Sequence, residues 1–219
     1  PFITGLYLSF CNFTTVSNAK FVGFENYIKA FSSSQRFGQA FGFTTLFTII
    51  SIITVNIIAF TLAYLLTRKI KGTNFFRTVF FMPNLIGGIV LGYTWQSMIN
   101  AILAKYGTTL VADAKYGFIG LIILMNWQMI GYMMIIYIAG LQNVPTELIE
   151  ASKIDGATKW QTLRYVTIPM VMPSITICLF LTLSNSFKLY DQNLALTSGA
   201  PMHKTEMLAL NIVNSFYGR

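Results

Sequence analysis

The sequence predicts an all-α, polytopic membrane protein built as a bundle of transmembrane helices. Of its 219 residues, 54% are hydrophobic and only 10% are charged, whereas soluble domains carry roughly 25% charged residues. The apolar residues also gather into uncharged runs, each longer than the roughly 20 residues that a helix needs to cross a bilayer. These runs cover Phe37–Thr67, Thr78–Ala104, Tyr116–Thr146 and Tyr165–Phe187.

A transmembrane β-barrel is the alternative way to cross a bilayer. It would show segments of about 10 residues in which polar and apolar side chains alternate, but Phe47–Ile58 is almost continuous in Ile, Thr and Val. A helix satisfies every backbone group within one continuous apolar segment, so the sequence favours helices.

The net charge of +8 raises the alternative of nucleic-acid binding. The Lys and Arg residues lie in the connections between the apolar runs, which is typical of membrane topology rather than of a nucleic-acid surface. Cys11 and Cys178 are too few and too far apart to predict a disulfide framework or a metal site. We therefore expect a lipid bilayer as the surroundings, no nucleic-acid partner and no metal.

The chain opens on an apolar stretch, Pro1–Phe10, which is too short to span and is expected to be the outer end of a truncated helix. A polar connection, Asn12–Gln39, follows outside the membrane, and a second span is expected over Phe41–Leu66. Basic residues come directly after this span and mark that side as cytoplasmic. They are Arg68, Lys69, Lys71 and Arg77.

A third span is expected over Val79–Ile99, with Pro83 bending or starting its helix. Gly88 and Gly92 in this span have the GxxxG spacing that lets a second helix approach closely, although transmembrane helices are also rich in glycine for other reasons. The chain is then expected to lie outside over Asn100–Lys115.

A fourth span is expected over Tyr116–Leu141, so that the loop Gln142–Ile168 lies in the cytoplasm, and a fifth over Val166–Phe187 leads back outside. The outer segment Lys188–Arg219 has no spanning length of its own, and a sixth helix is expected beyond it. Residues 1–219 are therefore predicted to form a single transmembrane domain, with five spans present in whole or in part and a cytoplasmic loop at 142–168.

The loop between the fourth and fifth spans is predicted to form two helical pieces separated by a turn at Gly156. Pro145 and Thr146 can start the first piece, with Thr146 as its cap, and Glu147 and Glu150 suit the positive end of the helix dipole. Composition alone leaves two interpretations open. The helix could lie on the lipid surface, or it could fill a groove on a partner protein.

The spacing in this loop resembles a known motif. Glu150–Ser152 (Glu-Ala-Ser), three residues, Gly156, nine residues and Val166–Pro169 (Val-Thr-Ile-Pro) resemble the EAA motif of importer-type ATP-binding-cassette (ABC) permeases. That motif is EAA, three residues, G, nine residues and I-x-L-P. The departures from it are conservative and fall at Ser152, Val166 and Ile168.

Two further segments extend the resemblance. Phe76–Pro83 looks like the opening of the family's third helix, and Leu196–Pro201 looks like its outer LTxGGP segment. Both are typical of the carbohydrate-uptake branch, near the larger permease of the maltose transporter. The implied fold is the transmembrane helical bundle of a type I ABC importer permease.

In that family the loop docks a short coupling helix into a cleft on a cytoplasmic ATPase. The resemblance implies that the Glu150 carboxylate reaches a basic group on the ATPase, and that Gly156 permits a turn closed to residues with a Cβ. A solvated carboxylate that caps the helix is the simpler alternative for Glu150. The residues expected to couple to the ATPase are Glu150, Ala151, Ser152, Asp155, Gly156 and Pro169.

The family architecture further implies a second homologous permease, two cytoplasmic ATPase subunits and an external substrate-binding protein, in the cell (inner) membrane of a bacterium or archaeon. The chain contains no phosphate loop of the form GxxxxGK[ST]. ATP is therefore expected to be bound and hydrolysed by the ATPase subunits, and this chain is expected to have no cofactor and no enzymatic activity of its own.

Polar groups inside a membrane are costly unless they face a cavity or a partner, so they indicate where a polar solute could pass. In a gap-free alignment outward from the EAA motif, Tyr132 resembles a sugar-contacting Tyr of the larger maltose permease. Asn185, Ser186 and Leu189 fall on its fifth-helix sugar contacts, where the residue identities differ. With Asn126 they make up the expected substrate pathway, and hydrogen bonding between helices is the open alternative for the polar members.

The expected substrate is a sugar or oligosaccharide, with another small polar solute, such as a glycerol phosphate or a polyamine, as the alternative. Lys188 and Asp191, three residues apart, are expected to pair with each other. An ion-coupled secondary transporter is the rival class, but the four apolar runs contain no isolated carboxylate of the kind that a proton or ion relay needs.

Overall fold

The computed structural model describes residues 1–32, 35–68 and 71–217, and within them the predicted all-α fold is confirmed. Strands are limited to a short antiparallel pair near the N-terminus, β1 (Cys11–Asn12) and β2 (Lys20–Phe21). Two residues named above, Lys69 and Arg219, lie outside the described residues.

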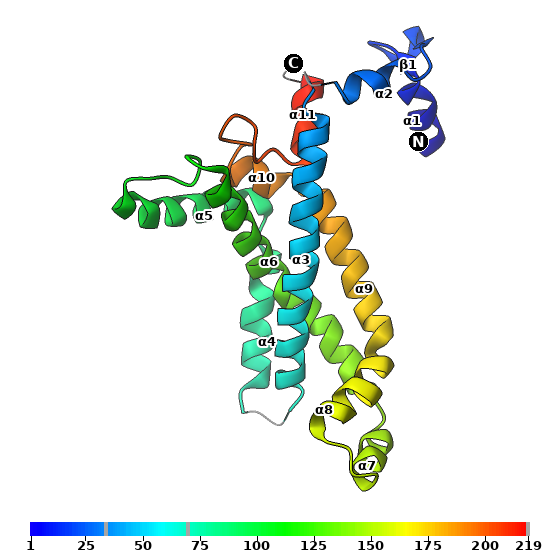
Figure 1. Ribbon diagram of the computed structural model, residues 1–219, viewed down its shortest axis with the longest axis vertical. Coiled ribbons are helices and arrows are strands. Elements are labelled where there is room, and N and C mark those ends of the chain that lie inside the picture. The colour runs from blue at the N-terminus through cyan, green and yellow to red at the C-terminus, as the bar shows by residue number, and fades with distance from the viewer. Residues whose placement is uncertain (33–34, 69–70, 218–219) are drawn as a thin grey trace.

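Three long helical runs form the centre of the molecule and confirm three of the predicted spans. They are α3 (Phe37–Leu66), α6 (Ala114–Gln142) and the run Lys159–Phe187, each long and apolar enough to cross a membrane. The last of these consists of α8 (Lys159–Thr162), a π-helical segment (Leu163–Thr167) and α9 (Ile168–Phe187). In Figure 1, α3, α6 and α9 run along the length of the molecule and cross one another.

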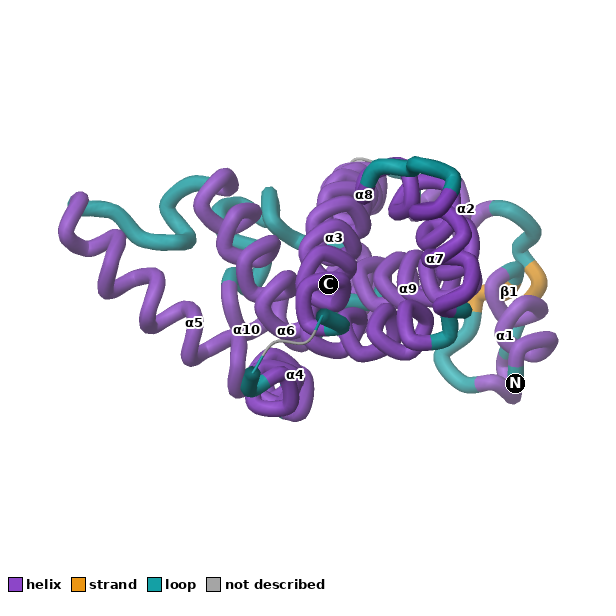
Figure 2. The backbone as a smooth tube through the Cα atoms, turned by 90° about the horizontal axis from the view of Figure 1, so that it is seen from below, coloured by secondary structure: helices purple, strands orange, loops and turns teal. Residues whose placement is uncertain are grey.

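The predicted third span is sharply broken. α4 (Thr73–Phe81) continues into a 3-10 turn (Met82–Leu85), the backbone is extended at Ile86 and Gly87, and α5 (Gly88–Leu103) then leaves at 101° to the first half. The predicted third span over Val79–Ile99 thus consists of two helices that are long and apolar enough for a membrane when taken together, and the bend expected at Pro83 falls just after it, at Ile86 and Gly87. Figures 1 and 2 show α4 along the bundle and α5 extending away from it.

Short helices lie at the end of the bundle from which α5 extends. α10 (Asp191–Leu196) packs on the GxxxG glycines of α5, since a Cβ on Gly92 would lie 2.5 Å from the Cβ of Ala195. The close approach predicted at these glycines is therefore confirmed. At the same end lie α11 (Leu208–Tyr217), α1 (Phe2–Ser9) and α2 (Glu25–Ala30), together with two 3-10 turns, Val16–Asn18 and Ala104–Tyr106.

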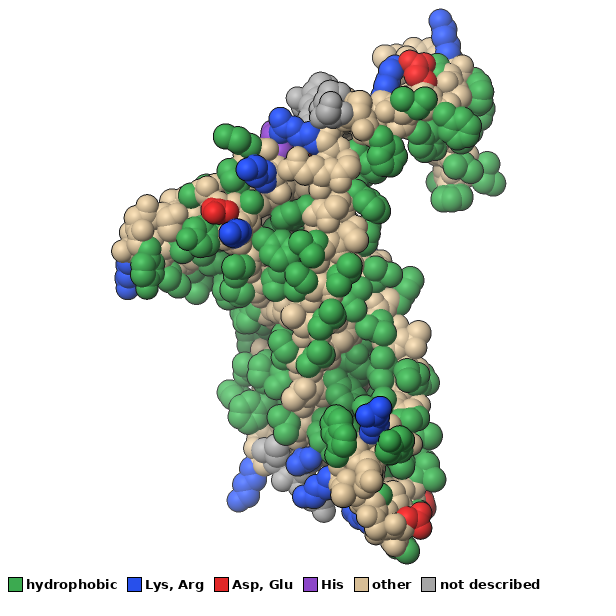
Figure 3. Space-filling model, in the orientation of Figure 1, with side chains coloured by type: hydrophobic (Ala, Val, Ile, Leu, Met, Phe, Trp, Pro, Cys, Tyr) green, Lys and Arg blue, Asp and Glu red, His purple; other side chains and the backbone are tan. Residues whose placement is uncertain are grey.

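The two ends of the bundle separate the connections as the sequence predicts. The end of α3, the start of α4 and the segment that contains α7 (Thr146–Ile154) and α8 all lie at the lower end of Figure 1. The segments expected outside the membrane lie at the upper end. In Figure 3, apolar side chains cover the length between the ends, and Lys and Arg side chains lie at both ends.

A buried hydrogen-bonded cluster joins the three long helices. The hydroxyl of Tyr137 in α6 donates to Oδ1 of Asn56 in α3 at 2.7 Å. Nδ2 of Asn56 donates to Oγ1 of Thr182 in α9 at 3.3 Å, and also to the carbonyl of Ile52. Each of the three spans thus supplies one polar side chain to the cluster.

A glycine sets the distance between α4 and α6. A Cβ on Gly131 would overlap the backbone of Phe80 and Phe81.

We expect Gly131→Ala to lower the free energy of unfolding in detergent by about 1–3 kcal/mol, since overpacking a well-fitted contact forces the backbone apart. The matched control is Gly38→Ala in α3, where a Cβ would meet no atom within 4 Å. Equal stability of the two variants would contradict this packing.

Candidate functional site

The loop between α6 and α9 forms the two predicted helical pieces, and the turn between them depends on Gly156. After α7 the amide of Gly156 donates to the carbonyl of Lys153 (3.1 Å), and the amide of Ala157 donates to that of Ser152 (2.9 Å). This pair of bonds is the Schellman arrangement that ends a helix on a left-handed residue. Gly156 has φ +79°, a conformation that glycine adopts without the steric cost of a Cβ.

The caps of the two pieces differ from the prediction. Thr146 is the first residue of α7 and Pro145 is its N-cap, so the prediction of Thr146 as the cap is wrong. Proline fixes φ near the value needed before a helix, and the Thr146 side chain is not required there. The second piece carries the side-chain cap: Thr158 and Gln161 bond each other's backbone amides in a capping box.

Ser152, one of the three departures from the EAA motif, connects the two pieces. Its buried hydroxyl donates to the carbonyl of Ile149 (2.8 Å) and lies 3.0 Å from Oγ1 of Thr162 in α8. A hydroxyl at this position therefore joins α7 to the helix that continues into the membrane.

The other residues predicted to couple to an ATPase lie on the surface of the loop or, for Pro169, at the start of α9. Glu150, Ala151, Asp155, Gly156 and Pro169 are exposed. Within the described residues, neither Glu150 nor Asp155 forms an ion pair. On the same helix, the side chain of Ile154 is 86% exposed. α7 thus presents an unpaired carboxylate beside a large apolar group, a combination suited to a protein partner.

The π-helical segment Leu163–Thr167 joins the loop to α9, two residues before Pro169. Proline has no amide to donate and its ring conflicts with the carbonyl four residues earlier, so the regular α-helical ladder cannot run through this point. The wider π turn accommodates this missing bond. As a result the helix continues from the loop to Phe187 without a break.

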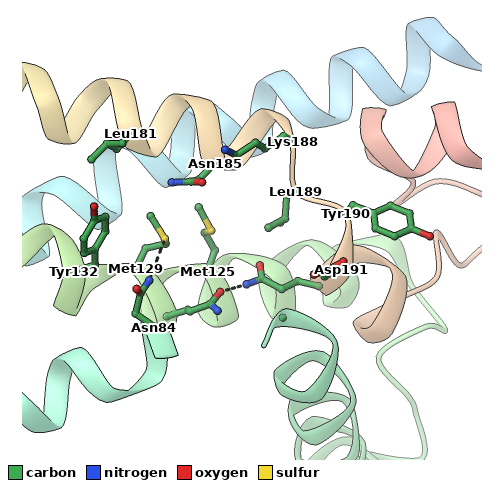
Figure 4. A pocket seen from close by; sticks show the side chains of 13 residues that line it. Asn84, Met125, Met129, Tyr132, Leu181, Asn185, Lys188, Leu189, Tyr190 and Asp191 are labelled. Atoms are coloured by element: carbon green, nitrogen blue, oxygen red, sulfur yellow. Dashed lines mark hydrogen bonds between the residues drawn. The ribbon is translucent and has the colours of Figure 1, made fainter. Parts of the chain in front are cut away.

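A cavity of about 590 Å³ lies near the other end of the bundle. It is bounded by α6, the end of α9, the break between α4 and α5, and the beginning of α10. Three of the predicted pathway residues, Tyr132, Asn185 and Leu189, line it (Figure 4). Its remaining lining residues are Asn84, Gly88, Met125, Gln128, Met129, Leu181, Lys188, Tyr190, Asp191 and Gln192.

Hydrogen bonds between neighbouring segments fix part of the polar lining. Gln192 donates to Oε1 of Gln128, and Gln128 donates through Nε2 to the carbonyl of Ile86 (3.1 Å) at the break between α4 and α5. Asn84 in the same break lies against the sulfur of Met129 (3.9 Å). The amide of Asn185 and the ring of Tyr132 face the cavity from α9 and α6 (Figure 4).

The two other predicted pathway residues do not line this cavity. Asn126 is buried and donates to the carbonyl of Ile122 (2.8 Å), one turn earlier in α6. Ser186 is fully buried on α9. Both side chains therefore lie in the packed interior of the bundle, although they neighbour cavity residues in the sequence.

The ion pair expected between Lys188 and Asp191 is not formed in the described part of the chain. α9 ends at Phe187 and α10 starts at Asp191, so these residues lack the helical spacing on which the prediction depended. Asp191 instead packs against Gly88. A Cβ added to Gly88 would lie 2.9 Å from the Cβ of Asp191.

Sequence reasoning missed Asn84 and Gln192 as cavity residues. Asn84 follows Pro83 inside an apolar run, and a polar residue beside a helix-breaking proline is a signal that could have identified it. Gln192 offered no such signal, because only the fold brings the segment after α9 back to the cavity. Among the described residues, no group of three or more His, Cys, Asp or Glu side chains could hold a metal ion.

The fold and the two sites together define a class. A multi-pass helical bundle that holds a polar cavity near one end and an exposed helix at the other suits a transport permease. The chain belongs to the family of binding-protein-dependent transport system inner membrane components, which matches residues 73–218.

Similar proteins place it among the ABC importer permeases of the carbohydrate branch. It is 44% identical, over 99% of this chain and 77% of the relative, to a protein described as a probable starch degradation products transport system permease, AmyD, of Thermoanaerobacterium thermosulfurigenes. It is 33% identical, over 98% of this chain and 77% of the relative, to the multiple sugar-binding transport system permease protein MsmF of Streptococcus mutans.

Solved structures share the fold. A bacterial ABC transporter involved in the import of the acidic polysaccharide alginate matches 98% of this chain and 77% of its own chain with a TM-score of 0.80 and 20% identity. A second structure, of an alginate ABC transporter in complex with an alginate pentasaccharide-bound periplasmic protein, matches 89% of this chain and 70% of its own with a TM-score of 0.71 and 20% identity.

The left-handed turn at Gly156 can be tested directly. We expect Gly156→Val to loosen the loop, because a β-branched side chain at φ +79° costs about 1–2 kcal/mol or more, and limited proteolysis should cleave the loop faster. Gly156→Asn should leave the cleavage rate nearly unchanged, since Asn tolerates the left-handed conformation. If Val and Asn have the same effect, strain at this turn is not what holds the loop.

Proposed function

We propose that this chain forms the translocation pathway for a sugar or oligosaccharide in an ATP-driven importer, and that it couples transport to hydrolysis by a separate ATPase subunit. The observation that carries the proposal is the surface of α7, where Glu150 is exposed without an ion pair in the described residues and Ile154 is 86% exposed. This surface offers a partner protein an apolar contact and a charged hydrogen-bond acceptor on one helix.

The proposed assembly contains a second homologous permease, two cytoplasmic ATPase subunits and an external substrate-binding protein, in the inner membrane of a bacterium or archaeon. The sequence contains no phosphate loop, which supports hydrolysis by another polypeptide. The alginate transporter bound to its periplasmic protein supports an external binding protein for a chain of this fold. In this assembly, residues 1–219 act as one transmembrane domain, and the loop 142–168 is the docking site.

The lining of the cavity supports a neutral, hydroxyl-rich substrate over a charged one. Amide side chains and Tyr132 offer both donors and acceptors, and the lining carries one Lys and one Asp, so it has no net charge. A glycerol phosphate would favour an excess of cations and a polyamine an excess of carboxylates. The volume of about 590 Å³ lies within the roughly 300–1,000 Å³ typical of small-molecule sites.

Docking of the ATPase is tested by Glu150→Ala. We expect the ATPase to copurify poorly with this variant, because removing one partner of a buried charge pair costs about 2–5 kcal/mol. The matched control is Glu147→Ala, which removes an exposed carboxylate one turn earlier on the same helix. Normal copurification and normal uptake with Glu150→Ala would contradict the proposed docking contact.

The substrate pathway is tested by Asn185→Ala and Tyr132→Ala. Both remove cavity-lining groups, so we expect sugar uptake into vesicles to fall about tenfold or more, which corresponds to the loss of one or two hydrogen bonds to the substrate. Asn126→Ala is the control, since Asn126 lies near the cavity in sequence but does not line it. The pathway would have to be placed elsewhere if Asn126→Ala reduced uptake in an intact complex while the two cavity variants did not.

A further inference from the structure

A second cavity, of about 380 Å³, lies at the opposite end of the bundle from the polar cavity. It is formed where the end of α3 meets α7 and α8, and no residue predicted to couple to the ATPase lines it. The lining residues are Tyr64, Thr67, Arg68, Ile149, Lys153, Ala157, Lys159 and Thr162. We call it the basic cavity.

The basic cavity collects positive charge from three separate elements. Arg68 follows the end of α3, Lys153 lies in the last turn of α7, and Lys159 is the first residue of α8. The lining contains no Asp or Glu, and in the described part of the chain no ion pair joins these three to a carboxylate. Three cations that face one cavity repel one another and make its electrostatic potential positive. A bound anion would offset this repulsion.

One of the cations is held in position by an aromatic ring. The guanidinium of Arg68 lies 4.8 Å from the centre of the Tyr64 ring, and both side chains line the cavity. Such a contact orients the planar guanidinium and leaves its N–H groups free for an oxyanion. The cavity therefore has the chemistry of a phosphate site.

The position of the basic cavity relative to the membrane indicates which kind of molecule supplies the phosphate. The lining includes Tyr64 in the last turn of α3, a span that ends at Leu66. Leu65, in the same turn, is exposed. Trp160 and Tyr165, next to the cavity along the chain, are 64% and 69% exposed. Exposed Trp and Tyr beside the end of a span are typical of the level of the lipid headgroups.

We propose that the basic cavity binds the phosphate group of an anionic phospholipid from the cytoplasmic leaflet, with Arg68, Lys153 and Lys159 as its cationic contacts. Basic cavities between transmembrane helices on the cytoplasmic side favour such headgroups. The bound lipid would join α7 to the end of α3. It would thereby fix the loop that carries Glu150, which lies three residues before Lys153 on α7.

The test measures lipid bound to the assembled transporter, purified in neutral detergent, by native mass spectrometry with added phosphatidylglycerol or phosphatidylcholine. We expect phosphatidylglycerol to be retained preferentially. The triple variant R68Q/K153Q/K159Q should weaken its binding about tenfold or more, since each cation near an anionic headgroup contributes roughly a fivefold factor. The triple variant R68K/K153R/K159R keeps the charges and should retain binding, which separates loss of charge from misfolding.

The matched control is K20Q/K105Q/K115Q, which removes three exposed cations from segments at the other end of the molecule. It should bind phosphatidylglycerol like the unmodified protein.

The proposal is overturned if the two Gln variants behave alike, or if phosphatidylcholine binds as well as phosphatidylglycerol. It is also overturned if inorganic phosphate competes as effectively as the lipid, or if lipid binds only after the ATPase subunits are stripped off, since an acidic segment of the ATPase would then be the occupant.

Discussion

The hydrogen-bonded cluster of Asn56, Tyr137 and Thr182 is the contact on which the rest of the bundle depends. Lipid tails are as apolar as the helix surfaces, so transmembrane helices gain little by burying apolar groups against one another. Close packing and polar contacts must then determine which faces meet. The cluster is buried, and each of the three spans contributes one side chain to it. Its geometry positions α9 relative to α3 and α6, and with α9 the polar cavity near one end and the loop 142–168 at the other.

The continuous helical run Lys159–Phe187 gives a physical connection between these two ends. α8 is tied to α7 through Ser152 and Thr162, and the far end of the run carries Asn185 into the polar cavity. One helical run therefore joins the loop 142–168 to the polar cavity. Bending would concentrate at the π turn Leu163–Thr167 and at Pro173, where the regular hydrogen-bond ladder is interrupted.

The sequence predicted the spans well, because long uncharged runs have one stable conformation in lipid, and it predicted the turn at Gly156 from spacing. It predicted a bend at Pro83 but not the angle of 101°, since hydropathy measures length and not direction. It also could not separate Asn185, which lines the cavity, from the neighbouring Ser186, which is buried. α6 and α9 are apolar on nearly all sides, so periodicity does not distinguish a packed face from a cavity face.

The central claim is that α7 is the surface on which an ATPase subunit docks, and site-specific photocrosslinking tests it most directly. A photoreactive residue at Ile154, 86% exposed on α7, should capture the ATPase subunit in membranes that contain the assembled transporter. The same probe at Ile53, 52% exposed within the span α3, should capture none. Capture of lipid alone at Ile154, with no ATPase adduct, would contradict the account.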